Sequence, residues 1–208
     1  MSDAVSSTPL VVVISGPSGA GKTTLCDNVR AALPSVSRAV TCTTRKPRDG
    51  ELDGVDYYFL GEDEFLGRVE GGEFLENAVV HGNHYGVLKS ELRAKLAEGS
   101  DVLLNIDVQG AATIRDAAPD DPVLNEALLT VFLCPGSLGE LEQRLRGRST
   151  DSDEIIAKRL AIARDEMDQA EKFDHTLTSQ TREADLGQML GIIERARLAK
   201  RETVSTDE

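Results

Sequence analysis

Residues 10–30 read LVVVISGPSGAGKTTLCDNVR, and this stretch is more informative about the architecture than any other part of the chain. The apolar, β-branched run at residues 10–15 predicts a buried strand, and the segment from Thr24 onward is typical of a helix. Between them, Gly16 to Thr23 matches the pattern G-x-x-x-x-G-K-[ST]. A match that lies between a strand and a helix indicates a phosphate-binding loop, and hence a nucleoside triphosphate site.

The residue types of this loop suit phosphate binding. Glycines let the backbone curl so that successive N–H groups face an anion, and the following helix adds partial positive charge. Lys22 can reach the β- and γ-phosphates, and the Thr23 hydroxyl can bind Mg²⁺. The alternative, a glycine-rich turn with an incidental lysine, is disfavoured because spacing and flanks agree. We therefore expect the triphosphate to contact Gly16, Pro17, Ser18, Gly19, Ala20, Gly21, Lys22, Thr23 and Thr24.

Length and composition limit the classes of protein to consider. The chain has 208 residues, 40% of them hydrophobic and 28% charged, which predicts a single globular domain. No apolar run reaches the length of a membrane span and the N-terminus lacks signal-peptide features, so we expect a cytoplasmic protein without membrane contact. Cys26, Cys42 and Cys134 are scattered, which favours free thiols over disulfides or a zinc site.

The formal net charge of −13 is unfavourable for a nucleic-acid binder. Because phosphates still have to be held, we expect the positive charge to be concentrated in one cleft. Two clusters fit this expectation: Arg45, Lys46 and Arg48, and Arg144, Arg146 and Arg148.

Apolar runs alternate with helical patterns, which predicts an α/β fold with an open, mostly parallel sheet flanked by helices. The expected strands are residues 10–15, 36–41, 102–106, 129–133 and 175–178. The expected helices are residues 23–33, 89–98, 109–117, 137–147, 152–171 and 183–199. Two segments break this alternation. One is an insertion at residues 42–88, with a short helix around 62–69, and the other is a polar connector at residues 147–152.

Further motifs follow the loop in a specific order. They are T-T-R-x-P-R-x-G-E at residues 43–51, D-Y-x-F at 56–59, F-L-E at 74–76, G-N-x-Y-G at 82–86, I-D-V-Q-G at 106–110 and R-L-R-G-R at 144–148. With these motifs the sequence resembles the guanylate kinase family of P-loop nucleoside monophosphate kinases, from about residue 10 to about residue 170. The resemblance implies Mg²⁺-dependent transfer of the ATP γ-phosphoryl group to GMP or dGMP.

The resemblance also implies that residues 10–200 form a single domain with three parts. The core would comprise residues 10–41, 86–136 and 172–200, with a GMP-binding α+β subdomain at 42–85 and a helical lid at 137–171. We expect residues 1–9 and 201–208 to be flexible ends. The sequence leaves the oligomeric state open between monomer and homodimer.

The prediction of the acceptor site rests both on the chemistry of the residues and on the resemblance. Two arginines three positions apart form a forked clamp for a phosphate, and tyrosine hydroxyls can complete it. A glutamate can accept hydrogen bonds from the N1–H and N2-amino groups of guanine, which adenine does not offer. Arg45 is further implied to approach the transferred group, and Asp107 to lie near the guanine and the metal. The expected acceptor residues are Thr41, Arg45, Arg48, Glu51, Tyr57, Glu76, Tyr85 and Asp107.

Purely structural roles remain open for several of these residues. Tyr57 can be edge-strand packing, Glu76 a solvated charge, and Asp107 only the cap of the next helix.

On the donor side, the resemblance assigns Arg148 and Arg159 to the transferred phosphate and Arg144 to the neighbourhood of adenine. With Lys22 and Arg45, Arg148 and Arg159 are the expected catalytic residues, while Thr23 and Asp107 are the expected metal ligands. Catalysis of phosphoryl transfer rests on positioning and charge neutralisation, so a set of cations without a general base suffices.

Three positions depart from the family pattern. Asn105 stands where many members have Asp, Val87 where a Ser or Thr is usual, and Thr178-Ser-Gln180 where V-N-D is usual. Two other functions stay open. One is a P-loop kinase for a different phosphorylated acceptor, such as a sugar phosphate, and the other is a non-catalytic binding module.

Overall fold

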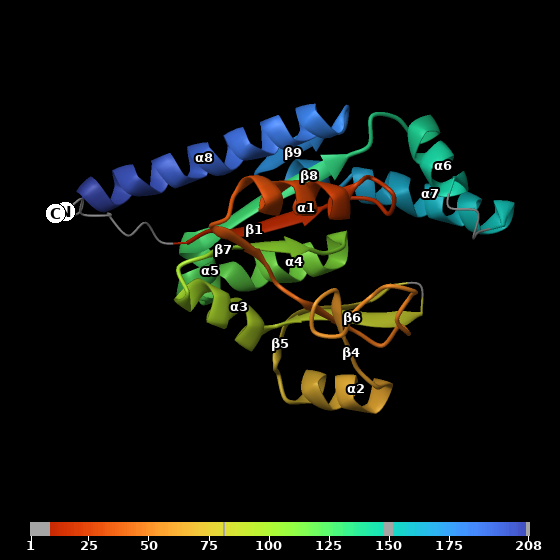
Figure 1. Ribbon diagram of the computed structural model, residues 1–208, viewed down its shortest axis with the longest axis horizontal. Coiled ribbons are helices and arrows are strands. Elements are labelled where there is room, and N and C mark those ends of the chain that lie inside the picture. Colours follow the sequence, from red (N-terminus) through yellow and green to blue (C-terminus); the bar gives the residue numbers. More distant parts are fainter. Residues whose placement is uncertain (1–8, 81, 148–151, 207–208) are drawn as a thin grey trace.

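The computed structural model describes residues 9–80, 82–147 and 152–206, which form two sheets with helices around them (Figure 1). The larger sheet has the strand order β2-β7-β1-β8-β9, and all its pairs are parallel. Its strands are β1 (Val11–Ser15), β2 (Val36–Arg38), β7 (Asp101–Asn105), β8 (Leu128–Cys134) and β9 (His175–Thr178). The expected α/β class with a mostly parallel sheet is confirmed.

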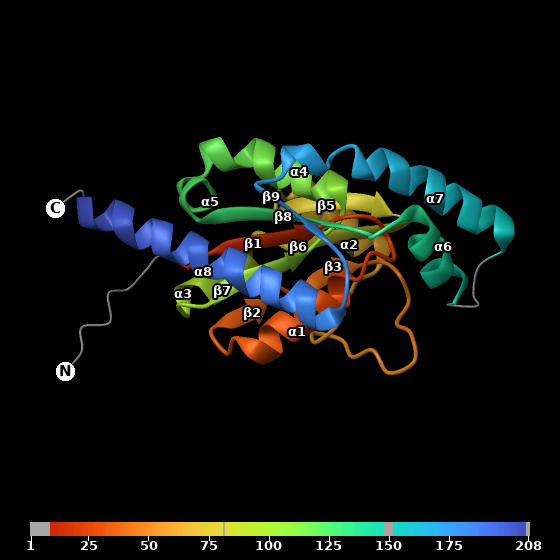
Figure 2. The same ribbon diagram turned by 90° about the horizontal axis from the view of Figure 1, so that it is seen from above.

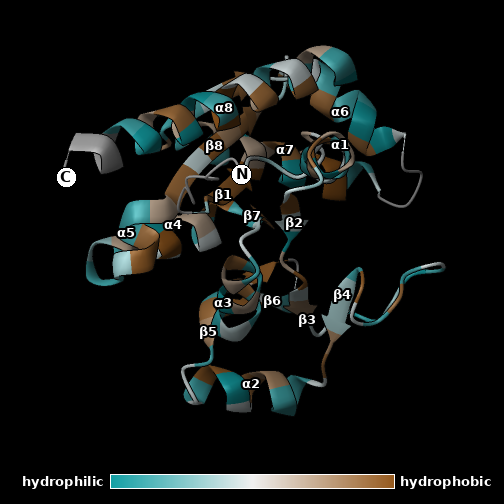
Figure 3. Cartoon of the chain, turned by 60° about the vertical axis from the view of Figure 1, so that its left-hand side comes forward, coloured by the Kyte–Doolittle hydropathy of each residue, from teal (hydrophilic) through white to brown (hydrophobic). Residues whose placement is uncertain are grey.

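Helices cover both faces of the larger sheet (Figure 2). One face carries α1 (Lys22–Ala32) and α8 (Arg182–Thr206), and the other carries α3 (Lys89–Ala97), α4 (Val108–Ala117) and α5 (Pro122–Ala127). Alternate residues of β1 serve the two cores: Val11 and Val13 pack towards α4, while Val12 and Ile14 pack towards α1 and α8. Hydrophobic and hydrophilic bands alternate along α8 (Figure 3), as expected for a helix that buries one face.

The smaller sheet lies to one side with the order β4-β3-β6-β5. It consists of β3 (Thr41–Thr43), β4 (Tyr57–Phe59), β5 (Phe74–Val80) and β6 (Asn83–Leu88), and α2 (Glu62–Glu70) packs on it through Phe65. Two further helices, α6 (Leu138–Arg146) and α7 (Asp153–Met167), share a small apolar cluster of Leu141, Leu145, Ile156 and Ala163. Short 3₁₀ helices occupy Ala118–Asp120 and Ala170–Lys172.

The structure corrects the predicted elements in four places. The strand expected at residues 36–41 is two strands, because Val36–Arg38 pairs with β7 whereas Thr41–Thr43 pairs with β4 and β6. The helix expected at 152–171 ends at Met167, and the one expected at 183–199 extends to Thr206. Helix α5 was not expected, although Asp121 caps it and Pro122 begins it.

In residues 9–80, 82–147 and 152–206, none of the helices combines the length and the apolar character that crossing a bilayer requires.

Candidate active site

The phosphate-binding loop curls tightly at the carboxyl end of β1. Gly16, Gly19 and Gly21 have φ values of 137°, 91° and 107°, in the region that glycine alone adopts readily. A Cβ on Gly16 would lie 2.3 Å from the carbonyl oxygen of Leu133, so no larger residue fits there. The Lys22 ammonium donates to the carbonyl oxygens of Gly16 (2.5 Å) and Pro17 (3.0 Å). The lysine is thereby held inside the loop that the sequence predicts.

The carboxyl end of the neighbouring strand β7 brings polar groups up to this loop. The amide nitrogen of Asn105 donates to the Thr23 hydroxyl at 3.1 Å. Asp107 caps α4 by accepting from the Gly110 N–H at 2.8 Å, so the capping role left open in the sequence is present. A hydroxyl and a carboxylate are hard oxygen donors of the kind that Mg²⁺ uses, usually with water and substrate phosphates completing its shell. Among the described residues no group of three or more His, Cys, Asp or Glu is placed to hold a metal ion.

Glu166 on α7 is a charged neighbour of this site that sequence reasoning missed. Burial raises the pKa of its carboxyl group, the Lys22 ammonium lowers it, and the Asp107 carboxylate raises it further. No motif pointed to it, because its position depends on how α7 folds back towards the loop.

On the smaller sheet, Glu76 is only 4% exposed and is not the solvated charge considered above. Its Oε1 accepts from the Val87 N–H at 3.1 Å, and a Cβ on Gly110 of α4 would lie 2.4 Å from its Oε2. Burial raises the pKa of the carboxyl group to about 8, Asp107 contributes to the rise, and the Val87 hydrogen bond opposes it. Val87 itself is fully buried, so its contribution here is its backbone. Thr41 is buried on β3, between Tyr57 and Val87 of the adjacent strands.

An arginine–tyrosine cluster lies on the same sheet. Arg45 makes two hydrogen bonds to Glu51, with Nη1 to Oε2 at 3.0 Å and Nη2 to Oε1 at 2.9 Å. The Arg45 hydrogen bond lowers the pKa of Glu51. The Arg45 guanidinium lies 5.2 Å from the Tyr57 ring centroid, and the Tyr57 and Tyr85 rings are 6.2 Å apart.

The two arginines of the predicted clamp are held differently. The backbone N–H of Arg48 donates to Glu51 at 2.7 Å, while Arg48 as a whole is exposed. Arg45, Glu51, Tyr57 and Tyr85 are thus brought together, and Arg48 is joined to them through its backbone.

The α6–α7 pair approaches the phosphate-binding loop directly. Arg144 Nη1 donates to the Ala20 carbonyl oxygen at 3.0 Å. A Cβ on Gly19 would lie 3.0 Å from Leu141 Cδ1, which shows how closely α6 packs on the loop. Arg159 lies half-buried on α7. The prediction for Arg148 falls outside the residues that the structure describes.

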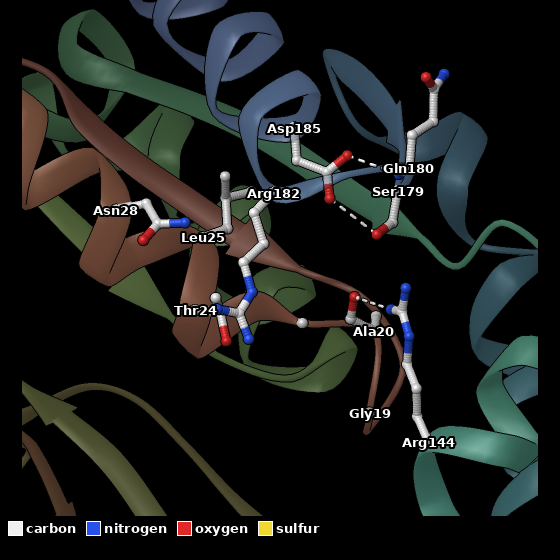
Figure 4. Close-up of a pocket in the computed structure, with 11 residues that line it drawn as sticks. Gly19, Ala20, Thr24, Leu25, Asn28, Arg144, Ser179, Gln180, Arg182 and Asp185 are labelled. Atoms are coloured by element: carbon white, nitrogen blue, oxygen red, sulfur yellow. Dashed lines mark hydrogen bonds between the residues drawn. The ribbon is translucent and has the colours of Figure 1, made fainter.

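A cavity of about 350 Å³ adjoins the loop (Figure 4). Its wall combines the loop, α1, Arg144 and the segment that leads from β9 into α8. The lining residues are Gly19, Ala20, Gly21, Thr24, Leu25, Asn28, Arg144, Ser179, Gln180, Arg182 and Asp185.

This architecture defines a class. A phosphate loop on the central strand of a parallel sheet, beside a smaller sheet that carries an arginine cluster and a buried carboxyl group, is that of a P-loop phosphotransferase. The guanylate kinase family model matches residues 8–196, and the chain belongs to this family.

Known relatives agree with this assignment. A guanylate kinase of Cereibacter sphaeroides is 44% identical over 171 residues, which cover 82% of this chain and 79% of that protein. One from Bifidobacterium longum is 45% identical over 172 residues, covering 82% and 86%. The crystal structure of guanylate kinase from Anaplasma phagocytophilum gives a TM-score of 0.74 at 29% identity, covering 92% of this chain and 87% of that one.

Proposed function

We propose that this protein transfers the γ-phosphoryl group of ATP to GMP, and to dGMP, giving ADP and GDP or dGDP. The observation that carries the proposal is Glu76, a buried carboxyl group between the smaller sheet and α4. An ionised carboxylate accepts two hydrogen bonds, and guanine offers two donors at N1 and N2 whereas adenine presents a lone pair. A site built on such bonds discriminates between the bases by about 10⁴–10⁵.

The remaining residues supply charge at the acceptor phosphate and the donor. Arg45, Arg48, Tyr57 and Tyr85 are proposed to hold the GMP phosphate, with Glu51 fixing Arg45 and the Arg48 backbone. Thr41 and Asp107 flank the base in this proposal. One P–O bond to the β-phosphate breaks and one to a GMP phosphate oxygen forms. Because the acceptor is already an ionised phosphate, positioning and charge neutralisation carry the catalysis.

The cations on the donor side come from two parts of the fold. Lys22 lies within the loop, and Arg144, Arg148 and Arg159 come from the lid segment at residues 137–171. Mg²⁺ fits the oxygen donors of Thr23 and Asp107, and when bound it neutralises phosphate charge. Asn105 orients the Thr23 hydroxyl in this scheme. We also propose a cytoplasmic location, which Cys26, Cys42 and Cys134 support as free thiols.

The test is ADP release from ATP with Mg²⁺, offering GMP, dGMP, AMP, CMP, UMP and a sugar phosphate in turn. Turnover confined to GMP and dGMP is expected. Turnover with the sugar phosphate alone would mean that the acceptor site serves another substrate. Binding of ATP and GMP without turnover would point to a binding module instead.

A further inference from the structure

Glu91 on α3 lies where the chain passes between the two sheets. Residues 39–40 lead from β2 of the larger sheet into β3 of the smaller one, and α3 leads back from β6 towards β7. The next residue, Leu92, is buried in the core on one face of the larger sheet, so α3 belongs to that layer. Any group of the smaller sheet that Glu91 binds is therefore held relative to the larger sheet and its phosphate loop.

The two carboxylate oxygens of Glu91 reach two different strands of the smaller sheet. Oε1 accepts from the N–H of Val40, just before β3, at 3.1 Å, and Oε2 accepts from the hydroxyl of Tyr58, in β4, at 3.3 Å. The Lys95 ammonium, one turn further along α3, lies 3.6 Å from Oε1. Because the Glu91 side chain is only 13% exposed, these partners replace much of the water around its charge.

Each hydrogen-bond partner of Glu91 is next in sequence to a residue of the proposed acceptor site. Val40 precedes Thr41, and Tyr58 follows Tyr57. Successive side chains of a strand point to opposite faces, so Tyr58 joins the apolar cluster on which α2 packs while Tyr57 faces the arginine–tyrosine cluster. Thr41 and Tyr57 are also paired across β3 and β4. One carboxylate thus holds the backbone beside both members of this pair.

Strand β4 is placed largely by contacts of this kind. It has three residues and forms one edge of the smaller sheet, where it pairs with β3. Residues 44–56 before it form an irregular loop (Figure 3). From β2, Arg38 donates to the Asp56 carbonyl oxygen at 3.3 Å, and its guanidinium lies 5.8 Å from the Tyr57 ring centroid. The larger sheet and its helices therefore hold β4 through Arg38 from β2 and through Glu91 from α3.

We propose that Glu91 is a positioning residue of the acceptor site, which it serves by holding Thr41 and Tyr57 in place through its bonds to the Val40 N–H and the Tyr58 hydroxyl. This inference rests on the proposed function, since it assigns Glu91 a role in the same site. Glu91 acts through these neighbours and not by contact with the nucleotide. Its loss therefore weakens binding of GMP and leaves the donor side, on the larger sheet, unchanged.

The test compares the KM values for GMP and ATP in the native protein and four variants. Glu91→Ala should raise the KM for GMP about tenfold while the KM for ATP stays within about twofold, since a misplacement of about 1 Å costs up to about 10²-fold. Tyr58→Phe should raise the KM for GMP about fivefold, which corresponds to one ordinary hydrogen bond. The control is Lys95→Ala, which leaves both hydrogen bonds of Glu91 in place and should alter neither KM.

The fourth variant, Glu91→Gln, separates positioning from a general loss of stability. Its amide oxygen still accepts from the Val40 N–H and its amide nitrogen can donate to the Tyr58 oxygen, so the KM for GMP should stay within about twofold of the native value. An unaltered KM for GMP in Glu91→Ala, an equal rise for ATP, or a Gln variant as weak as the Ala variant would overturn the proposal. If Glu91→Ala does not fold, Tyr58→Phe, which keeps the ring in its apolar cluster, decides the matter.

A measurement without nucleotide distinguishes failure of this proposal from failure of the proposed function. If GMP is neither phosphorylated nor bound, the proposed function fails. Hydrogen–deuterium exchange of residues 40–43 and 57–59 then still tests the placement of the two strands. Exchange should be faster in Glu91→Ala than in the native protein and unchanged in Glu91→Gln. Equal exchange in the native protein and Glu91→Ala would show that Glu91 does not hold these strands.

Discussion

Glu76 combines 4% exposure with a single backbone hydrogen bond from Val87 and the nearby charge of Asp107. A carboxylate in such a place is poorly solvated, which is why its pKa rises to about 8. At pH 7 the group is therefore mostly protonated in the free protein. If guanine binds to Glu76 as proposed, its two hydrogen bonds require the ionised form, so binding of GMP has to release this proton.

This linkage predicts the sign of the pH dependence. Well below the pKa of about 8, each rise of one pH unit favours ionisation of Glu76 and should tighten GMP binding by up to about tenfold. Titration calorimetry of GMP without Mg²⁺ between pH 6 and pH 8.5 measures this slope. The control is Glu76→Gln, which should bind GMP on the order of 10³-fold more weakly and lose the Glu76 contribution to the slope. Equal slopes in the two proteins would show that guanine does not meet this carboxyl group.

Lys22 lies within its loop through bonds to two carbonyl oxygens, which a triphosphate would compete for. Lys22→Ala should lower kcat by roughly 10²–10³, with a smaller rise in the KM for ATP, because the charge matters most in the transition state. Arg148→Ala should behave alike. Steady-state kinetics measures both effects. The matched control is Lys89→Ala, which should leave kcat unchanged; the Lys89 ammonium donates to the Gly72 carbonyl oxygen in the turn between α2 and β5. An effect on KM alone would contradict the assigned roles.

At the scale of elements, the close approach of α4 to β5 positions Glu76. Replacing glycine by alanine inside a helix normally stabilises it by about 1 kcal/mol. At Gly110, however, the new Cβ would lie 2.4 Å from Glu76 Oε2, so the carboxyl group has to move. Gly110→Ala should therefore raise the KM for GMP tenfold or more while the KM for ATP stays within about twofold. The factor corresponds to misplacing one specific contact.

The control for this experiment is Gly187→Ala on α8, where nothing lies within 4 Å of the added methyl group. It should raise the free energy of unfolding by about 0.5–1 kcal/mol without altering either KM. Initial-rate kinetics and chemical denaturation of both variants separate the two effects. A Gly110→Ala variant with the native KM for GMP would place the acceptor elsewhere.

The elements that the sequence predicted well are those whose signals are local. The loop, β1, β7, β8 and most helices follow from apolar runs, glycines and caps. The split of residues 36–41 has no such signal, because it depends on long-range partners: the Ala39 N–H donates to Leu103, and the Val40 N–H to Glu91 on α3. The same holds in the site. Motifs indicated Lys22, Arg45 and Glu76, whereas Glu166 and Arg182 acquire their neighbours only when distant elements pack together.

At the scale of the whole molecule, a net charge of −13 has to coexist with a site for two anionic nucleotides. The arginines of the two predicted clusters do not all direct their positive charge at this site. Arg45 and Arg144 face the site, but Arg146 is an exposed residue that pairs with Glu142 and Asp153. Only selected members of each cluster therefore contact residues of the candidate site.

Helix α8 links the two ends of the larger sheet. Near its start Asp185 holds the turn at Ser179–Gln180 beside the cavity that adjoins the phosphate loop, and further along Arg197 bonds to Asp101 at the amino end of β7 (2.5 Å and 2.8 Å) and to Ser35 (3.0 Å). Asp101 is 6% exposed and also accepts from the Leu10 N–H at 2.7 Å. This ion pair lies at the end of the sheet opposite the phosphate loop, so it should affect stability and not catalysis.

Arg197→Ala should lower the free energy of unfolding by about 3 kcal/mol, because a buried carboxylate loses its charged partner. For a domain of this size that corresponds to a fall in Tm of roughly 10 °C. Adding Asp101→Asn should recover part of the loss, since the amide oxygen still accepts from Leu10 and no charge remains buried. Arg195→Ala, on an exposed position of the same helix, should change stability by less than about 0.5 kcal/mol. Thermal unfolding of the native protein and these three variants, with kcat measured at 25 °C, decides the matter. If Arg197→Ala lowered kcat while leaving Tm unchanged, the ion pair would affect catalysis through α8 and would not stabilise the sheet.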